Sequence, residues 1–435
     1  MNKGKLYIET YGCQMNFSDS EIVASVLSDD YDVIDKATEA DLILINTCSI
    51  REHAEQRVLN RLSELNALRK NNSRLQIGII GCMAERIKEE LFKTGSVDLV
   101  VGPDAYRSLP TLLKKESRVN INVLLSETET YDDIHPIRYD TNGISAFISI
   151  MRGCNNYCSY CVVPYTRGRE RSRNPQTIIN EALSLFEKGY REVTLLGQNV
   201  NSYCCDGVNF ARLMKSVAEI NPLLRIRFAT SHPKDLSDEL LEVMSSCSNI
   251  CKSIHLPAQS GNDRVLKAMN RKYTRRWYLD RIASIRKYMP ECSISTDFIT
   301  GYCDETEEEH QDTLTLMQTV SFDYAYMFKY SEREGTRSAN TKADTVPEEV
   351  KARRLTEIIT LQQELSGKSN LKDVGKTMEV LAEGTSKRSE EHFFGRNSQN
   401  KVVVFPRGSC SKGEYVSVRI TSCTSATLTG NLIDN

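Results

Sequence analysis

The chain has 435 residues, of which 26% are charged and 40% are apolar, and its formal net charge is −2. This length predicts two or three domains, each burying its own core. The near-neutral charge excludes a general attraction to nucleic acid, so an RNA contact must come from local basic patches. No apolar window is long enough to span a membrane, and the N-terminal segment runs into a strand-like stretch without a secretion leader, so we expect a cytoplasmic protein.

Residues 1–118 alternate short apolar runs with amphipathic stretches. This alternation predicts an α/β domain with a parallel sheet. The expected strands are Leu6–Glu9, Leu42–Ile45, Ile77–Ile80 and Val97–Val101. The expected helices are Ser20–Leu27, His53–Leu68, Arg86–Phe92 and Tyr106–Leu113.

Three cysteines of this domain, Cys13, Cys48 and Cys82, each follow one of the expected strands at separations of 35 and 34 residues. One strand–helix unit has about this length, so adjacent parallel strands would bring the three sulfurs to one carboxyl edge, where open α/β sheets bind ligands. Three thiolates can hold a [4Fe–4S] cube and leave one iron free. The alternative is that the three are small buried residues, because free cysteine often packs as a hydrophobe.

A polar linker, residues 119–145, precedes a second region, residues 146–370. Six strand–helix units in this region predict a partial (β/α)6 barrel with its chemistry at the carboxyl-terminal strand ends. The expected strands are Ala146–Met151, Glu192–Leu196, Arg225–Ala229, Ser253–Leu256, Ser293–Ile299 and Asp323–Tyr330. The expected helices are Pro175–Glu187, Phe210–Ile220, Asp238–Met244, Arg264–Met269, Tyr273–Tyr288 and Glu305–Thr319. Polar residues gather at the same strand ends: Gln198, Asn199, Ser231, His232, Gln259, Ser260 and Asp297.

The loop after the first barrel strand contains Cys154, Cys158 and Cys161 in the spacing C-x3-C-x2-C, with Tyr160 before the third cysteine. Zinc is the competing ligand, but a structural zinc site takes four ligands, usually as two close pairs, and no second C-x2-C pair or nearby histidine completes one. A cube with one open iron fits three thiolates better. We interpret His232 as a turn cap. Seven further cysteines are interpreted as packing residues: Cys204, Cys205, Cys247, Cys251, Cys292, Cys410 and Cys423.

Residues 371–435 follow a charged helical stretch, Pro347–Lys368, and contain short strands separated by Gly and Ser turns, which predicts a small β-barrel. The expected strands are Thr377–Glu383, Phe393–Arg396, Lys401–Val404, Tyr415–Ile420 and Thr427–Leu432. Basic residues of this region would supply phosphate contacts to RNA: Lys387, Arg388, Arg396 and Lys401. The alternative is a solvated surface, because acids nearly balance the bases here.

Several motifs together resemble the radical S-adenosylmethionine (SAM) methylthiotransferases, and more narrowly the MiaB type, which acts on tRNA. They are Tyr11-Gly-Cys-Gln-Met-Asn16, Asn46-Thr-Cys-Ser-Ile-Arg51, Gly81-Cys82, the cysteine triad with Pro164-Tyr-Thr-Arg-Gly168, and Leu196-Gly-Gln-Asn-Val200. The C-terminal region resembles the TRAM RNA-binding module. One departure is visible: where the family commonly has Gly-Phe-Pro-Gly-Glu, this chain has Gly301-Tyr-Cys-Asp-Glu305, which places a new thiol, Cys303, close to the expected site.

The resemblance implies SAM and two [4Fe–4S] clusters as cofactors. The cluster on Cys154, Cys158 and Cys161 would bind SAM and generate a 5′-deoxyadenosyl radical, while the cluster on Cys13, Cys48 and Cys82 would carry the sulfur to be inserted. The residues that would contact SAM are Tyr160, Gly197, Gln198, Gln259 and Ser260.

The implied reaction inserts a methylthio group at C2 of N6-isopentenyladenosine 37 in the anticodon stem-loop of tRNA. The implied partners are an electron donor of the flavodoxin or ferredoxin type and a sulfur donor, and we expect a monomer. Two alternatives stay open: a methylthiotransferase that acts on threonylcarbamoyl-adenosine in tRNA or on ribosomal protein S12, and an iron–sulfur RNA-binding protein without turnover.

Overall fold

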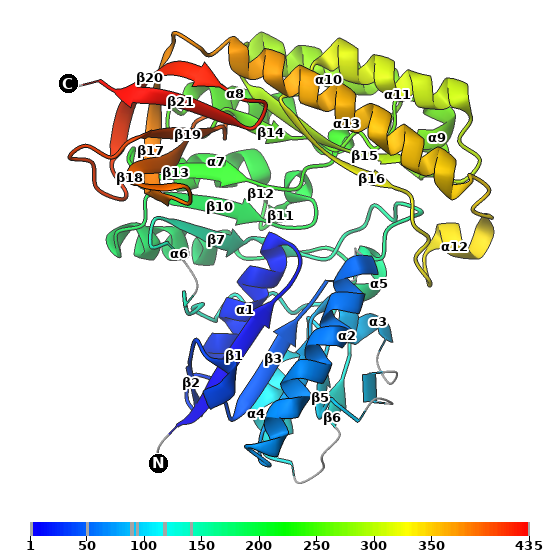
Figure 1. Cartoon of the computed structure of the whole chain (residues 1–435), viewed down its shortest axis with the longest axis vertical. Coiled ribbons are helices and arrows are strands. Elements are labelled where there is room, and N and C mark those ends of the chain that lie inside the picture. Colours follow the sequence, from blue (N-terminus) through cyan, green and yellow to red (C-terminus); the bar gives the residue numbers. More distant parts are fainter. Residues whose placement is uncertain are drawn as a thin grey trace.

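A computed structural model describes residues 3–48, 52–87, 91–92, 95–115, 120–139 and 142–433. An N-terminal α/β unit, a central barrel and a small β-barrel follow one another along the chain, and the central barrel lies between the other two (Figure 1). Within the described segments, no helix combines the length and the hydropathy needed to cross a membrane.

The N-terminal unit is built on a parallel sheet in the order β2-β1-β3-β4-β5-β6. Its strands are β1 (Gly4–Thr10), β2 (Tyr31–Val33), β3 (Leu42–Asn46), β4 (Gln76–Ile80), β5 (Leu99–Val101) and β6 (Asn120–Asn122). Strand β3 is buried throughout. Its alternate side chains enter two separate cores, one on each face of the sheet, because successive strand residues point in opposite directions.

The helices of this unit are α1 (Gln14–Val26), α2 (Glu52–Ala67), α3 (Cys82–Ile87) and α4 (Leu109–Leu113). The parallel-sheet expectation is confirmed, but two short strands, β2 and β6, were not predicted. Strand β6 falls inside the expected linker, which means that the sheet continues into it. Helix α3 begins at Cys82, earlier than the expected helix Arg86–Phe92, of which residues 88–90 lie outside the described chain.

The central unit is a partial barrel of two parallel three-stranded sheets, β13-β10-β7 and β14-β15-β16, connected by a bridge between Ile226 and Ile250. Its strands are β7 (Ser145–Ser149), β10 (Glu192–Leu196), β13 (Arg225–Phe228), β14 (Ser253–His255), β15 (Ser293–Thr300) and β16 (Tyr324–Lys329). The helices around it are α6 (Pro175–Glu187), α7 (Phe210–Ala218), α8 (Asp238–Ser246), α9 (Asp263–Ala268), α10 (Arg275–Tyr288) and α11 (Glu307–Val320). Among the described residues no ladder joins β7 to β16, so the barrel is open along that seam.

Helix α13 (Glu348–Leu371) crosses the outer face of β16 and leads into the small barrel (Figure 1). That barrel is closed in the order β17-β18-β19-β21-β20. Its strands are β17 (Thr377–Ser386), β18 (Ser389–Asn397), β19 (Val402–Pro406), β20 (Tyr415–Cys423) and β21 (Thr427–Leu432). The predicted C-terminal β-barrel is therefore confirmed.

The small barrel is attached to the amino-terminal ends of the central strands. Arg225, the first residue of β13, donates to the carbonyl oxygen of Arg396 at 2.6 Å. The backbone nitrogen of Lys252, just before β14, donates to Ser398 Oγ at 3.0 Å. Lys376 Nζ pairs with Glu291, just before β15, at 3.1 Å. The small barrel thus lies at the amino-terminal end of the central barrel. The reaction is expected at the opposite end, where the strands have their carboxyl-terminal residues.

Candidate active site between two cysteine triads

The first triad lies in the loop between β8 (Met151–Arg152) and α5 (Val163–Thr166). Gly153 begins this loop with a φ of +77°, and a Cβ atom here would lie 2.0 Å from the carbonyl oxygen of Arg169, so only glycine fits. Burial, together with the neighbouring Cys158, raises the pKa of Cys154 to about 11 and that of Cys161 to about 12. Metal coordination deprotonates such thiols, so the donor set suits an iron cluster.

The second triad gathers at the carboxyl edge of the N-terminal sheet. Cys13 is the N-cap of α1 after β1, Cys48 follows β3, and Cys82 begins α3 after β4. A hydrogen bond from the Cys48 thiol, with help from the Arg167 charge, lowers the pKa of Cys13 to about 6, and Cys13 is the exposed member of this triad. Gly12 has a φ of +123°, and a Cβ atom here would lie 2.6 Å from Cys48 Cβ, so glycine permits the close approach of the first two loops.

Polar residues of the cysteine motifs connect these loops. Asn16 Nδ2 donates to Asn46 Oδ1 at 3.0 Å, and Asn46 Nδ2 donates to Ser20 Oγ at 2.9 Å. A Cβ atom on Gly81, whose φ is +90°, would lie 2.4 Å from Asn46 Oδ1. The asparagines and glycines that flank the cysteines therefore hold the three loops in register.

A buried carboxylate joins the two triads. Asp19 on α1 is fully buried and accepts from Arg152 Nη1 and from Arg167 Nη2, each at 2.8 Å. Arg152 precedes the first triad, and Arg167 follows it in the Pro164-Tyr-Thr-Arg-Gly168 motif. Arg167 also donates through Nε to Cys82 Sγ at 3.1 Å. The cysteine pattern did not predict this connection, because nothing in the local sequence distinguishes Asp19 from a solvated helix residue.

Buried polar atoms collect at the carboxyl ends of the barrel strands. Several of them have no hydrogen-bond partner in the described part of the chain: Ser149 Oγ, Gln198 Oε1, Asn199 Oδ1, Ser231 Oγ, His232 Nε2 and Gln259 Oε1. Buried polar groups nearly always have a partner in a complete structure. The set therefore fits a polar ligand such as SAM in the mouth of the barrel.

The predicted SAM contacts divide into two kinds. Gln198 and Gln259 offer the partnerless oxygen atoms just described, and Gln259 has a φ of +70°, a strained conformation for this residue. Ser260 instead accepts from the nitrogen of Asn262 at 3.2 Å, and a Cβ atom on Gly197 would lie 2.3 Å from Met151 Cγ. Tyr160 packs beside an apolar cluster under the loop. Ser260, Gly197 and Tyr160 thus have evident roles in shaping the site.

Two further residues belong to the site. Arg271 is buried and donates to Cys158 Sγ at 3.3 Å, to the carbonyl oxygen of Pro257 at 2.8 Å and to the Tyr273 hydroxyl at 2.9 Å. Its position was not predicted, since an arginine after a short helix has no distinguishing pattern. His232 Nδ1 accepts from the nitrogen of Lys234 at 3.3 Å, which confirms the capping interpretation and leaves the proton on Nε2. Burial and the Arg271 and Lys234 charges lower the pKa of His232, so the ring stays neutral.

The open interior of the barrel carries an aromatic face. Tyr324, Tyr326 and Phe328 alternate along β16 and are 51%, 47% and 37% exposed. The Tyr324 and Tyr326 rings lie 5.0 Å apart, and the His255 ring lies 5.9 Å from that of Tyr326. His255 Nε2 is in turn 3.3 Å from Asp297 Oδ1. A flat base entering through the open seam would meet these rings.

Cys303 is fully buried in an apolar cluster with Val265, Met269 and Tyr330, and Tyr160 of the triad loop packs against the same cluster. The thiol thus lies close to the first triad, as the motif indicated, but it is a packing residue. Among the basic residues of the small barrel, Lys387 and Arg388 are exposed in the turn between β17 and β18.

Arg396 and Lys401, by contrast, are committed to ion pairs within the protein. Arg396 Nη1 pairs with Glu383 at 2.6 Å, and Lys401 Nζ pairs with Asp373 at 2.7 Å. The Arg396 side chain is nevertheless 37% exposed, whereas that of Lys401 is 13% exposed. Their contact with RNA stays a prediction, with Lys401 the less accessible of the two. Across the described ranges, no three His, Cys, Asp or Glu side chains are grouped so as to share one metal ion.

Comparison with known families divides the chain as the fold does. Residues 5–102 match the Uncharacterized protein family UPF0004, residues 148–317 match the Radical SAM superfamily, and residues 371–433 match the TRAM domain. Among solved structures, the radical SAM methyltransferase TsrM from Kitasatospora setae superposes with a TM-score of 0.57 at 13% identity, over 75% of this chain and 73% of that one. This likeness establishes the shared fold.

Full-length relatives are much closer in sequence. A protein of Phocaeicola vulgatus is 57% identical and covers 98% of this chain and 95% of its own length; relatives from Bacteroides thetaiotaomicron and Porphyromonas gingivalis are 56% and 55% identical, each over 95% of their own length. All three carry the name tRNA-2-methylthio-N(6)-dimethylallyladenosine synthase. The chain belongs to this family of radical SAM methylthiotransferases.

Proposed function

We propose that the protein inserts a methylthio group at C2 of N6-isopentenyladenosine 37 in tRNA. The observation that carries this proposal is the pairing of two cysteine triads, on separate domains, through Arg167, Asp19 and Arg152. A one-cluster radical enzyme has no need of the second triad. The name shared by relatives at 55–57% identity supports this substrate over threonylcarbamoyl-adenosine or a ribosomal protein.

Radical SAM enzymes use SAM and [4Fe–4S] clusters, and the donor sets here suit two of them. We assign one cluster to Cys154, Cys158 and Cys161 and the other to Cys13, Cys48 and Cys82. When bound, these groups supply the one-electron chemistry that an unactivated aromatic C–H bond requires, together with the sulfur to be inserted.

The side chains around the clusters bind and orient. Gln198, Gln259 and Ser231 offer buried oxygen atoms to SAM, and His232 offers an N–H donor. The aromatic face of β16 stacks the target base. The ion pairs of Asp19 with Arg152 and Arg167 fix the spacing between the two triads. They also keep water out of the contact between the two domains, because all three charged side chains are buried.

The partners follow from this chemistry. The TRAM domain and the relatives support tRNA as substrate. An external one-electron donor, a sulfur donor, a monomeric state and a cytoplasmic location complete the proposal.

Replacing Cys13, Cys48 and Cys82 together by alanine tests the division of labour. The variant should lose about half of its iron, still convert SAM to 5′-deoxyadenosine, and form no methylthio nucleoside. A matched triple variant of buried cysteines outside the site, Cys251, Cys292 and Cys410, should keep its iron and its product. Mass spectrometry of nucleosides from treated tRNA measures the product, and normal methylthio yield from the first variant would refute the proposal.

A further inference from the structure

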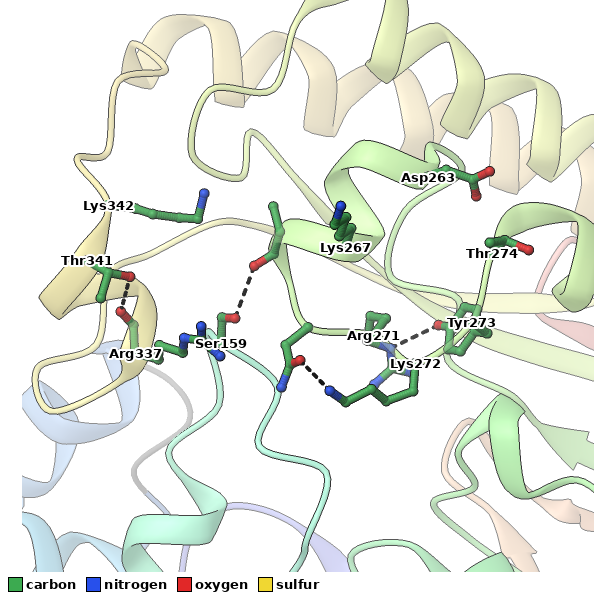
Figure 2. A pocket seen from close by; sticks show the side chains of 12 residues that line it. Ser159, Asp263, Lys267, Arg271, Lys272, Tyr273, Thr274, Arg337, Thr341 and Lys342 are labelled. Carbon is green, nitrogen blue, oxygen red and sulfur yellow. Dashed lines mark hydrogen bonds between the residues drawn. The ribbon is translucent and has the colours of Figure 1, made fainter.

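A cavity of about 740 Å³ opens on the outer side of the central barrel, between α9, the segment that connects α9 to α10, and α12 (Arg337–Thr341) (Figure 2). Gln198, His232 and Gln259 are not among the residues that line it. The cavity therefore opens beside the mouth of the barrel, where SAM and the target base are placed, and the side chain of Arg271 is shared between the two.

The cavity carries excess positive charge. Lys267, Lys272, Arg337 and Lys342 line it, whereas Asp263 is the only acidic residue that the described chain contributes to its lining. Lys272 Nζ donates to the neutral Asn270 Oδ1 at 2.7 Å. Among the described residues, the charged groups of Lys267, Arg337 and Lys342 have no acidic partner. Uncompensated cations around one cavity favour an acidic ligand.

The inner wall of the cavity is the loop that holds the first triad. Ser159, next to Cys158, lines the cavity, and its Oγ donates to the carbonyl oxygen of Ala268 at 3.0 Å. Arg271 also lines the cavity, and its Nη1 contacts Cys158 Sγ at 3.3 Å. A molecule seated here would be separated from a cluster ligand by a single layer of side chains.

We propose that this cavity is the docking site of an acidic one-electron carrier protein, of the flavodoxin or ferredoxin type, that reduces the cluster on Cys154, Cys158 and Cys161. The inference rests on the proposed function, because a radical SAM enzyme consumes one electron for each SAM cleaved reductively. The docked carrier is oxidised by one electron, the cluster is reduced by one electron, and no bond of the protein changes.

An RNA phosphate is the competing ligand for these cations, but the geometry favours the carrier. The target base has to enter the barrel interior, where the aromatic face of β16 lies, and the small barrel is attached at the opposite strand ends. The carrier needs proximity to the cluster from outside, and the basic cavity provides it. Complementary charge also raises association rates at low salt.

The test uses the holoenzyme with Lys267, Lys272 and Lys342 changed together to Glu. Calorimetry should give a dissociation constant for an acidic flavodoxin at least about tenfold weaker than wild type at low salt, with a flatter salt dependence. SAM cleavage driven by flavodoxin, its reductase and NADPH should fall in parallel, whereas cleavage driven by excess dithionite should stay unchanged. The corresponding Lys→Gln variant should show a smaller change in the same direction.

The control variant carries Lys70, Lys188 and Lys215 changed to Glu, which alters net charge equally at exposed sites elsewhere. Equal weakening of flavodoxin binding in this control would overturn the docking site. So would tRNA binding that weakens in the cavity variant while flavodoxin binding does not, because the cavity would then be an RNA contact. Failure of the wild type to cleave SAM with dithionite would instead refute the proposed function, so the two failures are distinguishable.

Discussion

A single buried carboxylate holds the two halves of the site together. Removing one partner of a buried ion pair leaves the other charges uncompensated, at a cost of about 3–5 kcal/mol. Asp19 has two such partners, Arg152 and Arg167, and all three side chains are no more than 3% exposed. Burial raises the pKa of Asp19, but the two arginines outweigh burial and lower it below its ordinary value.

Asp19→Asn should therefore destabilise the protein by about 3 kcal/mol or more at neutral pH. Because the folded pKa lies below the unfolded value of about 3.9, the stabilisation from the carboxylate is present above that value and is lost as pH falls through the folded pKa. The difference in urea unfolding midpoint between wild type and variant should shrink below about pH 4.

Glu64→Gln, on an exposed helix position with a surface ion pair, is the control. It should change the midpoint little at any pH. A difference between wild type and D19N that stays constant down to pH 3 would contradict the assignment of the ion pairs.

Residue-level prediction from the sequence succeeded where chemistry imposes a spacing. The six cysteines could be singled out because three-thiolate sites need repeated, positioned sulfurs, and in the structure each set of three lies on neighbouring loops. Their role as cluster ligands stays a prediction. Asp19, Arg167 and Arg271 were not assigned roles, because their partners lie on other domains or distant loops. The position of Cys303 near the triad loop was predicted, but its complete burial was not, since burial depends on packing that the motif alone does not reveal.

At the scale of elements, the first triad depends on a loop that only glycine can start. Gly153→Ala should abolish iron binding at Cys154, Cys158 and Cys161, because the new Cβ atom would meet the Arg169 carbonyl oxygen at 2.0 Å. Gly207→Ala is a matched control, with nearly the same φ, +76°, and with no atom of the described residues within 4 Å of the new Cβ. Iron content and the visible spectrum of each variant measure the result; equal iron in the two would contradict the steric argument.

The aromatic face of β16 makes a second prediction at this scale. Tyr324→Ala and Tyr326→Ala should each raise the KM for tRNA by about fivefold or more, since a stacked base contributes ~1–3 kcal/mol. SAM cleavage without RNA should be unaffected. Trp277→Ala removes an aromatic ring of similar exposure, 43%, from the outer helix α10 and serves as control. A KM that rises only in the Trp277 variant would place the RNA on the outer surface.

Long, strongly patterned elements were predicted well. The bounds of β10 and α6 agree with the expected Glu192–Leu196 and Pro175–Glu187, because an apolar run and a Pro at the first helical turn are strong local signals. Strands β2 and β6 have three residues each and were missed. Such short strands gain their order from the neighbouring strand, so their own sequence carries little signal.

For the whole molecule, RNA affinity should depend on the small barrel. Changing Lys387 and Arg388 together to Glu should weaken tRNA binding, because fewer phosphates are then neutralised by the protein. The slope of log affinity against log salt should fall by roughly one for each phosphate that no longer has a basic partner. Changing Lys36 and Lys70 together to Glu, at exposed positions of the N-terminal domain, gives the same change in net charge and serves as control. An unaltered slope in the double variant would move the phosphate-binding residues to another surface.

Because the small barrel is attached at the amino-terminal strand ends, it lies at a fixed distance from the cysteines. Strand β15 has 8 residues and so is about 26 Å long, and this length separates the small barrel from the edge where the cysteines lie. A polynucleotide gripped at one end and modified at the other has to bridge that span. The enzyme then selects its substrate by the length of the RNA as well as by the identity of the base. An isolated nucleoside, however well it fits the active site, cannot contact the small barrel at the same time.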